Sequence, residues 1–173
     1  MSAEDLRALI REIPDFPKPG ILFYDITTLL KNGPAFKESV QLMVEPFRGD
    51  KVDVVVGMES RGFIFSAPMA IELGAGFVPV RKLGKLPAET LSVEYALEYG
   101  TNTLEIHKDA VQPGQRVLIV DDLLATGGTV VGTIELLTML KAEVVGLAFL
   151  VELLFLKGRD RLKGHTIHSV IQY

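Results

Sequence analysis

The stretch from Val117 to Thr129 limits the possible folds of this chain more than any other. It begins with the consecutive apolar residues Val117–Val120, rich in β-branched types, which predict a strand buried on both faces. Asp121 and Asp122 follow, and we expect them to end the strand. A short Thr/Gly turn then leads into apolar residues at helical spacing from 130 to 140. This order is typical of a parallel sheet covered by helices.

The same strand, turn and helix start predict a binding site for a sugar phosphate. At a helix start, unpaired backbone N–H groups and the positive end of the helix dipole favour an anion. The acidic pair would repel a phosphate but can accept hydrogen bonds from sugar hydroxyls. The turn has neither the Walker A pattern G-x-x-x-x-G-K-[ST] nor the dinucleotide pattern G-x-G-x-x-G. The residues expected to hold the phosphate are Ala125, Thr126, Gly127, Gly128 and Thr129.

A hydrophobic strand followed by two acids and T-G-G-T resembles the phosphoribosyl-pyrophosphate (PRPP) signature of the type I phosphoribosyltransferases. The resemblance implies an α/β fold with a mostly parallel, twisted sheet flanked by helices. It implies one domain over residues 1–173, with a small N-terminal hood over about residues 1–30 and a mobile catalytic loop, or lid, over 81–100. It also implies that Asp121 and Asp122 hold the ribose hydroxyls, while the turn holds the 5′-phosphate.

Composition limits the class of protein further. With 173 residues the chain can bury about two-thirds of its unfolded surface in one domain. The net charge of −4 argues against a nucleic-acid surface, which is usually basic. The absence of cysteine excludes disulfides and thiolate metal sites. No apolar run reaches the roughly 20 residues of a membrane span, and the acidic start does not resemble a signal peptide, so we expect a cytoplasmic protein.

Apolar periodicity predicts alternating helices and strands along the chain. Ser2 and Asp5 suggest a helix cap before Leu6, Leu9, Ile10 and Ile13, which would share one helical face. Further helices are expected over 34–47, 63–73 and 130–140, and an irregular proline-rich segment over 14–26. Strands are expected over 52–56, 76–80, 103–106, 117–120, 143–151 and, at an edge, 167–171.

The turn Gly57–Gly62 predicts a second anion site at the same edge of the sheet. It also follows a buried strand and opens a helix, and Arg61 suits bidentate contact with a phosphate. A loop arginine alone is usually a solvated charge, but two anion sites at one edge indicate a ligand with phosphates at two ends. PRPP is such a ligand. The resemblance implies that Glu59, Ser60 and Arg61 lie at its pyrophosphate, with a cis peptide between Glu59 and Ser60.

Between Arg81 and Gly100 the periodicity is lost, and the segment is long for a connecting loop. Its basic part and the run Tyr95–Gly100 resemble the catalytic loop of the adenine-specific members of the family. A basic loop can also be a plain solvated face. The resemblance implies that Arg81, Lys82 and Lys85 neutralise pyrophosphate, that Tyr99 belongs to the lid, and that Glu98 handles a proton of the base.

The implied reaction transfers the phosphoribosyl group from PRPP to N9 of adenine and forms AMP and pyrophosphate, as in purine salvage. Glu98, Arg61, Asp121 and Asp122 are then the expected catalytic residues. Adenine is expected at Leu22, Phe23 and Tyr24, although many relatives carry arginine at the position of Tyr24, which leaves its role open. Mg²⁺ is expected through the substrate and water rather than through direct protein ligands. The resemblance also implies a homodimer.

Two alternatives stay open at the level of sequence. The base acceptor could be hypoxanthine, guanine, xanthine or uracil within the same class of enzyme. The chain could instead be a PRPP-sensing regulator that binds RNA or DNA. Its acidic net charge and the intact basic lid argue against the regulator.

Overall fold

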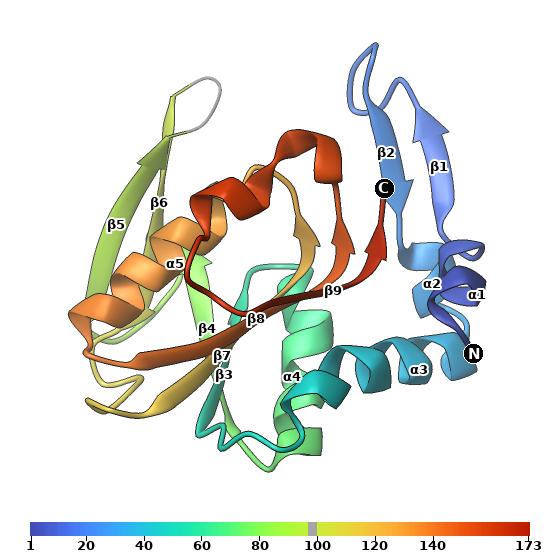
Figure 1. Cartoon of the computed structure of the whole chain (residues 1–173). Helices are drawn as coiled ribbons and strands as arrows, with labels where there is room; N and C mark the ends of the chain where they lie inside the picture. Colours follow the sequence, from blue (N-terminus) through green and yellow to red (C-terminus); the bar gives the residue numbers. More distant parts are fainter. Residues whose placement is uncertain (97–99) are drawn as a thin grey trace.

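The computed structural model describes residues 1–96 and 100–173 and contains a seven-stranded sheet with the order β5-β6-β4-β3-β7-β8-β9 (Figure 1). The five strands β4, β3, β7, β8 and β9 are mutually parallel, whereas β6 pairs antiparallel with β4 and β5. The sheet is therefore mostly parallel, as predicted. The strands are β3 Val54–Met58, β4 Gly76–Lys82, β5 Thr90–Ala96, β6 Thr101–His107, β7 Arg116–Leu124, β8 Glu143–Glu152 and β9 Ile167–Gln172.

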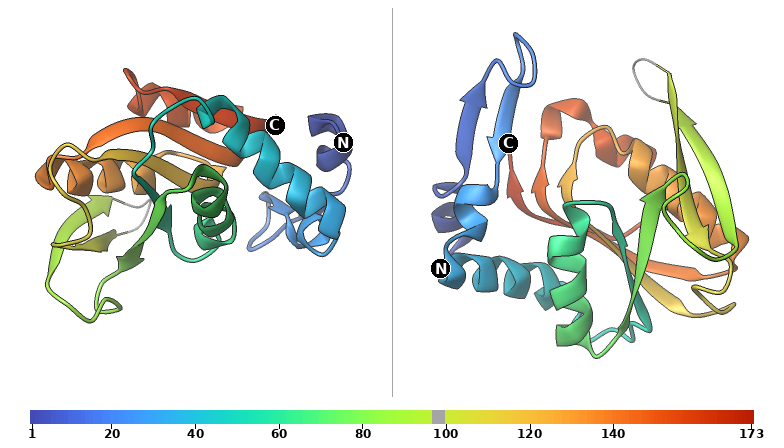
Figure 2. Two further views of the ribbon diagram at one scale, coloured as in Figure 1. Left: turned by 90° about the horizontal axis from the view of Figure 1, so that it is seen from below. Right: turned by 180° about the vertical axis from the view of Figure 1, so that it is seen from behind.

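Helices cover both faces of the sheet because the central strands are apolar on both sides (Figure 2). On one face, Leu118 and Val120 of β7 share a core with residues of α3 Gly33–Val44 and α4 Gly62–Leu73. On the other face, Val117 and Ile119 share a second core with residues of α5 Gly128–Met139. Alternate residues of one strand thus enter opposite cores, as the pleat of a strand requires.

The N-terminal part differs from the prediction of one helix through Ile13. The helix α1 Ala3–Arg7 does begin with the predicted capping box of Ser2 and Asp5, but it ends early. Ile13 lies in β1 Arg11–Pro14, which pairs antiparallel with β2 Leu22–Asp25 before α2 Thr27–Leu30. The pairing of β1 with β2 outweighed the helical spacing of the apolar residues in this segment. The prolines occupy the turn of this hairpin and its margins.

Two further predictions need correction. Asp121 and Asp122 do not end their strand, because β7 continues to Leu124 beside β8. The expected loop over 81–100 is partly strand, since β4 reaches Lys82 and Thr90–Ala96 forms β5. The other predicted helices and strands are present with small shifts of their ends. The predicted helix over 34–47 ends as α3 at Val44, and Phe47 belongs to the short 3-10 helix η1 Glu45–Phe47.

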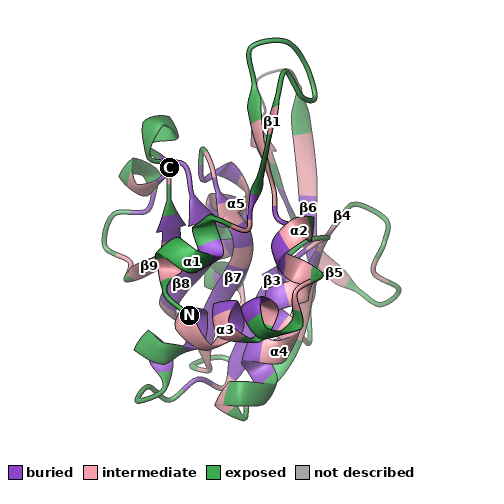
Figure 3. Ribbon diagram, turned by 90° about the vertical axis from the view of Figure 1, so that its right-hand side faces the viewer, coloured by how far each residue is buried: buried purple, intermediate pink, exposed green. Residues whose placement is uncertain are grey.

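Buried residues concentrate in the middle strands, and exposed residues lie at the hairpin tips and connecting loops (Figure 3). Two more short 3-10 helices, η2 Leu154–Leu156 and η3 Gly158–Arg161, connect β8 to the segment before β9. Within residues 1–96 and 100–173, no helix has the length and apolar character needed to cross a membrane.

Candidate active site

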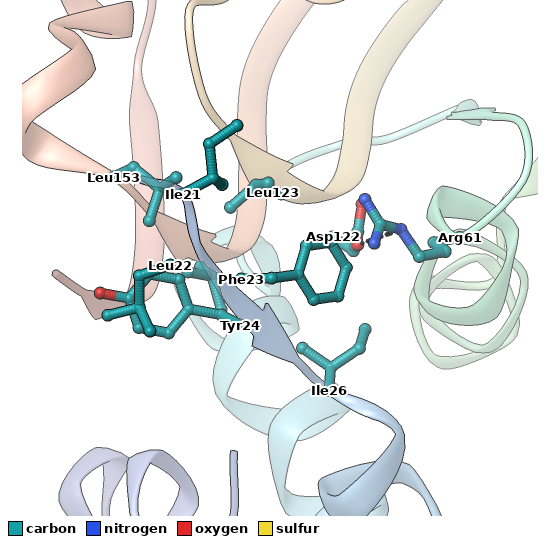
Figure 4. A pocket seen from close by; sticks show the side chains of 10 residues that line it. Ile21, Leu22, Phe23, Tyr24, Ile26, Arg61, Asp122, Leu123 and Leu153 are labelled. Carbon is teal, nitrogen blue, oxygen red and sulfur yellow. Dashed lines mark ion pairs between the residues drawn. The ribbon is translucent and has the colours of Figure 1, made fainter. Parts of the chain in front are cut away.

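An apolar cavity of about 170 Å³ lies between the N-terminal hairpin and the carboxyl ends of the central strands. Its apolar side chains point toward one another, and Asp122 and Arg61 lie at one end (Figure 4). Concave apolar pockets with a few polar groups are typical binding sites for small molecules. The cavity is lined by Ile21, Leu22, Phe23, Tyr24, Ile26, Arg61, Asp122, Leu123, Val151 and Leu153.

The strand β2 supplies one wall of this cavity and is held by contacts at its end. Oδ2 of Asp25 accepts hydrogen bonds from Arg11 on β1, and Oδ1 accepts from the backbone N–H and hydroxyl of Thr27. The Thr27 and Arg11 hydrogen bonds lower the pKa of Asp25 to about 2. Tyr24 stacks on Tyr173 with ring centroids 3.9 Å apart, so the residue whose role the sequence left open makes an aromatic contact.

The acidic pair of β7 divides between two hollows. Asp122 lines the apolar cavity, whereas Asp121 lines a smaller hollow at the glycine-rich turn, and Leu123 lines both. Asp122 is buried, and its Oδ2 lies 2.9 Å from Nε of Arg61. Arg61 follows β3 in the chain, so adjacent parallel strands bring the two predicted anion sites to one edge.

Asp121 is half-buried and faces the start of α4. Its Oδ1 accepts a hydrogen bond from the backbone N–H of Asp122 and faces Gly62, where an added Cβ would lie 2.9 Å away. Gly62 is the first residue of α4, so the lack of a side chain lets this carboxyl approach the helix start. Burial and the neighbouring Asp122 raise the pKa of Asp121 well above its usual value. A ligand that donates hydrogen bonds or supplies positive charge would stabilise its ionised form.

The glycine-rich turn has the geometry predicted for an anion cradle. Gly127, with φ +85°, caps α5 without any side-chain hydrogen bond, so the first N–H groups of the helix have no partner from the cap. The hollow beside it is lined by residues of the turn and by Asp121. All five residues predicted to hold a phosphate line this hollow: Ala125, Thr126, Gly127, Gly128 and Thr129.

The second predicted anion site contains an internal cluster of ions around Glu59. Its Oε2 lies 3.0 Å from Nζ of Lys85 and 3.3 Å from Nη2 of Arg81, and its Oε1 accepts from the backbone N–H of Lys82. Burial acts to raise the pKa of Glu59, but these hydrogen bonds outweigh it and hold the pKa below its usual value. The expected cis peptide between Glu59 and Ser60 is present.

A buried acid on β6 fixes the loop that follows these cations. Glu105 accepts hydrogen bonds from the backbone N–H of Gly84 and from the hydroxyl of Thr90. Both hydrogen bonds, Thr90 first, lower the pKa of Glu105. The loop between β4 and β5 is therefore attached to β6 rather than free along its length. The sequence did not single out Glu105, and its only signal was a charged residue in a strand.

The structure brings most of the predicted site residues to one edge of the sheet. Glu59, Arg81 and Lys85 form one cluster, Arg61 contacts Asp122, and Leu22, Phe23 and Tyr24 line the cavity. Ser60 is exposed in the turn between them. Glu98 and Tyr99 lie outside the described residues. The prediction missed the cavity residues Ile21, Ile26, Leu123, Val151 and Leu153, of which Leu123 belongs to the signature itself.

Comparisons with known proteins agree with this arrangement. The phosphoribosyl transferase domain family matches residues 25–168. The adenine phosphoribosyltransferase of Chloroflexus aurantiacus is 58% identical over 173 residues, which cover the whole of both chains. The adenine phosphoribosyltransferase structure from Thermoanaerobacter pseudethanolicus is 56% identical, with a TM-score of 0.96 over 99% of this chain and 100% of that one. The Saccharomyces cerevisiae enzyme, solved with an imino-altritol bisphosphate and adenine, is 41% identical, with a TM-score of 0.92 over 97% of each chain.

Proposed function

The chain belongs to the phosphoribosyltransferase family, and we propose that it transfers the 5-phosphoribosyl group of PRPP to N9 of adenine. The reaction breaks the bond between C1′ of the ribose and a pyrophosphate oxygen and forms a bond between C1′ and N9. The base loses one proton, and the products are AMP and pyrophosphate. In metabolism this reaction is purine salvage.

One observation carries the proposal: the neighbouring residues Asp121 and Asp122 line two hollows of different character. The apolar cavity suits a flat, neutral base between Phe23 and Leu123, and the hollow at the helix start suits a phosphate. A ribose joins a base to a 5′-phosphate, so it would lie across the acidic pair. Asp121 and Asp122 then accept hydrogen bonds from its 2′- and 3′-hydroxyls.

The charges of the site suit the change of charge during the reaction. As pyrophosphate leaves, positive charge develops at C1′ and negative charge on the departing oxygens. The acidic pair stabilises the sugar, while Arg61, Arg81, Lys82 and Lys85 neutralise pyrophosphate. Three of these cations have partners within the protein, namely Asp122 for Arg61 and Glu59 for Arg81 and Lys85. We propose that the phosphates of the substrate replace these internal partners.

Mg²⁺ fits this site as an ion that arrives with PRPP. The described residues contain no group of three or more His, Cys, Asp or Glu side chains arranged to hold a metal ion. The acidic pair instead offers carboxylate oxygens. Burial and the like charge of Asp122 raise the pKa of Asp121, and a cation would favour its ionised form. Bound through the pyrophosphate and ribose oxygens, Mg²⁺ would add positive charge near the leaving group.

The lid, residues 81–100, is proposed to close over the reacting atoms and exclude water. Glu98 then accepts the proton that the base loses, at N7, and Tyr99 belongs to the same lid. A Glu98→Gln variant should lose much more kcat than affinity for PRPP. If its kcat equals that of the unmodified protein, Glu98 has no such role.

The direct test is formation of AMP from Mg²⁺, PRPP and labelled adenine, with adenine in competition against hypoxanthine, guanine, xanthine and uracil. Adenine should react, and the other bases should neither react at a comparable rate nor compete at equal concentration. If no AMP forms, the proposed activity is wrong. If another base reacts faster, the family assignment stands but adenine is not the preferred acceptor.

We also propose that the whole chain acts as one phosphoribosyltransferase domain in a cytoplasmic homodimer. The side chains of Leu154, Phe155 and Leu156 on η2 are exposed, with Phe155 at 69%. Exposed apolar residues in a cluster are typical of an interface. Sedimentation should give twice the mass of one chain, and the mass of a single chain would contradict the dimer.

A further inference from the structure

Arg161, at the end of η3, lies over the first turn of α5. A Cβ placed on Gly128 would be 3.5 Å from Nη1 of Arg161 and 3.7 Å from the ring of Tyr95. The same point would be 3.9 Å from Oγ1 of Thr126. In Figure 1 the η3 segment lies beside the end of α5 where the helix begins. The guanidinium group therefore borders the glycine-rich turn, although Arg161 is distant from it in the sequence.

Arg161 has no ionic partner that would account for this position. In the described part of the chain, no carboxylate pairs with it, and its guanidinium makes no hydrogen bond. Its neighbour Arg159, by contrast, binds Glu152 through two hydrogen bonds of 2.6 and 2.9 Å. Of these two arginines on one short helix, Arg159 is neutralised inside the protein and Arg161 is exposed next to an anion cradle.

The backbone that carries Arg161 is fixed against the cradle. An added Cβ on Gly158 would lie 2.4 Å from the carbonyl oxygen of Ala125, and one on Gly127 would lie 3.1 Å from the carbonyl oxygen of Gly158. The two segments therefore pack backbone against backbone. Glu152 is 2% exposed and also accepts hydrogen bonds from Ser169 and Gln172, so the Arg159 contact is anchored to the sheet.

We propose that Arg161 binds the 5′-phosphate of PRPP and AMP, together with the backbone N–H groups of the cradle. The proposal rests on the proposed function and adds a side-chain ligand from a segment outside the signature. A guanidinium group matches phosphate geometry and forms charge-assisted hydrogen bonds. The Glu152–Arg159 contact acts as the positioning element because it holds η3 against Ala125.

The test compares ligands that differ only in the phosphate. In calorimetric titrations the unmodified protein should bind AMP more tightly than adenosine. In Arg161→Gln the Kd for AMP should rise about ten- to hundredfold, as expected for loss of a charge-assisted contact, while the Kd for adenosine stays unchanged. Arg161→Lys should recover part of the loss. Pyrophosphate, which tests the other end of the site, should bind Arg161→Gln as well as it binds the unmodified protein.

The control is Lys163→Gln, which removes the same charge from an exposed position two residues away. It should leave the affinities for AMP, adenosine and pyrophosphate unchanged. If Arg161→Gln leaves the ratio of AMP to adenosine affinity unaltered, or weakens pyrophosphate equally, Arg161 does not bind the 5′-phosphate. If the unmodified protein forms no AMP and does not prefer AMP to adenosine, the proposed function itself fails, and the role of Arg161 fails with it.

Discussion

Nε of Arg61, at the end of the turn after β3, lies 2.9 Å from Oδ2 of Asp122 on the adjacent strand β7. The contact joins the two anion sites that the sequence predicted separately. It also gives Arg61 a carboxylate partner within the protein. Arg61 therefore neutralises a buried carboxylate in addition to its proposed contact with a phosphate.

Arg61→Gln should therefore reduce both stability and catalysis. Asp122 would remain buried without its cation, and we expect a loss of about 1–3 kcal/mol in the free energy of unfolding, measured by urea denaturation. The control Arg48→Gln removes an exposed arginine with surface partners and should cost less than about 1 kcal/mol. Equal losses in the two variants would show that the Arg61–Asp122 contact contributes no more to the free energy of unfolding than the surface contacts of Arg48.

Asp121→Asn should have the opposite effect on stability while abolishing efficient catalysis. The folded-state pKa of Asp121 is raised, so folding disfavours its ionised form, and stability falls as pH rises above the unfolded value of 3.8. Asparagine does not ionise, yet its oxygen can still accept the hydrogen bond from the N–H of Asp122. At pH 7 the unliganded variant should therefore melt at a higher temperature than the unmodified protein.

The pH dependence separates this explanation from a general effect of substitution. The gain in Tm should shrink as the pH is lowered through 4 and vanish well below the unfolded pKa of 3.8, where Asp121 is protonated in both folded and unfolded states. A gain that is the same at pH 4 and pH 7, or a loss at pH 7, would contradict the raised pKa.

How much of the structure can be predicted from the sequence depends on how far apart in the chain the interacting residues lie. The strand and turn of the signature follow from local apolar runs and glycines, so α5 and the first part of β7, residues 117–120, were predicted. The continuation of β7 through Asp121 and Asp122 was not, because it depends on pairing with β8. The same reason explains β1 and β5, which are strands through pairing with β2 and β6. Arg161 lacked any local signal, since only packing of Gly158 on Ala125 brings it to the cradle.

Two glycines of this region should respond differently to alanine. At Gly128 an added Cβ meets only ordinary contacts, so Gly128→Ala should fold with nearly unchanged Tm but raise the KM for PRPP by occupying the cradle. At Gly158 the added Cβ meets a backbone carbonyl at 2.4 Å, which cannot move aside easily, so Gly158→Ala should cost about 1–3 kcal/mol.

Gly49→Ala serves as the control for both, because an added Cβ there meets nothing within 4 Å. It should change neither Tm nor KM. A normal KM for PRPP in Gly128→Ala would mean that the phosphate does not approach this turn.

Glu59→Gln should tighten the binding of pyrophosphate. The substitution removes the internal carboxylate that faces Arg81 and Lys85, so these cations no longer have to give up an ion pair when the ligand binds. The Kd for pyrophosphate, measured by calorimetry with Mg²⁺, should fall, and product release should slow. Glu105→Gln is a matched control on β6, because in the described residues Glu105 accepts hydrogen bonds only from Gly84 and Thr90 and pairs with no cation. An unchanged or weaker affinity for pyrophosphate in Glu59→Gln would contradict competition between Glu59 and the ligand.

The β1–β2 hairpin, which forms one wall of the apolar cavity, should lose stability in acid because Asp25 becomes protonated. Its folded-state pKa of about 2 lies below the usual 3.8, so the stabilisation is present above pH 4 and is lost as pH falls toward 2. We expect a contribution of about 1–2 kcal/mol, because the partner Arg11 is largely exposed and solvent screens the pair. Asp25→Asn should lower the free energy of unfolding by this amount at pH 7 and flatten its change between pH 4 and 2. Asp50→Asn, at an exposed position, should do neither.

Because Asp25 also fixes the end of β2, Asp25→Asn should raise the KM for adenine more than the KM for PRPP. Equal pH profiles for Asp25→Asn and the unmodified protein would show that this carboxylate does not hold the hairpin.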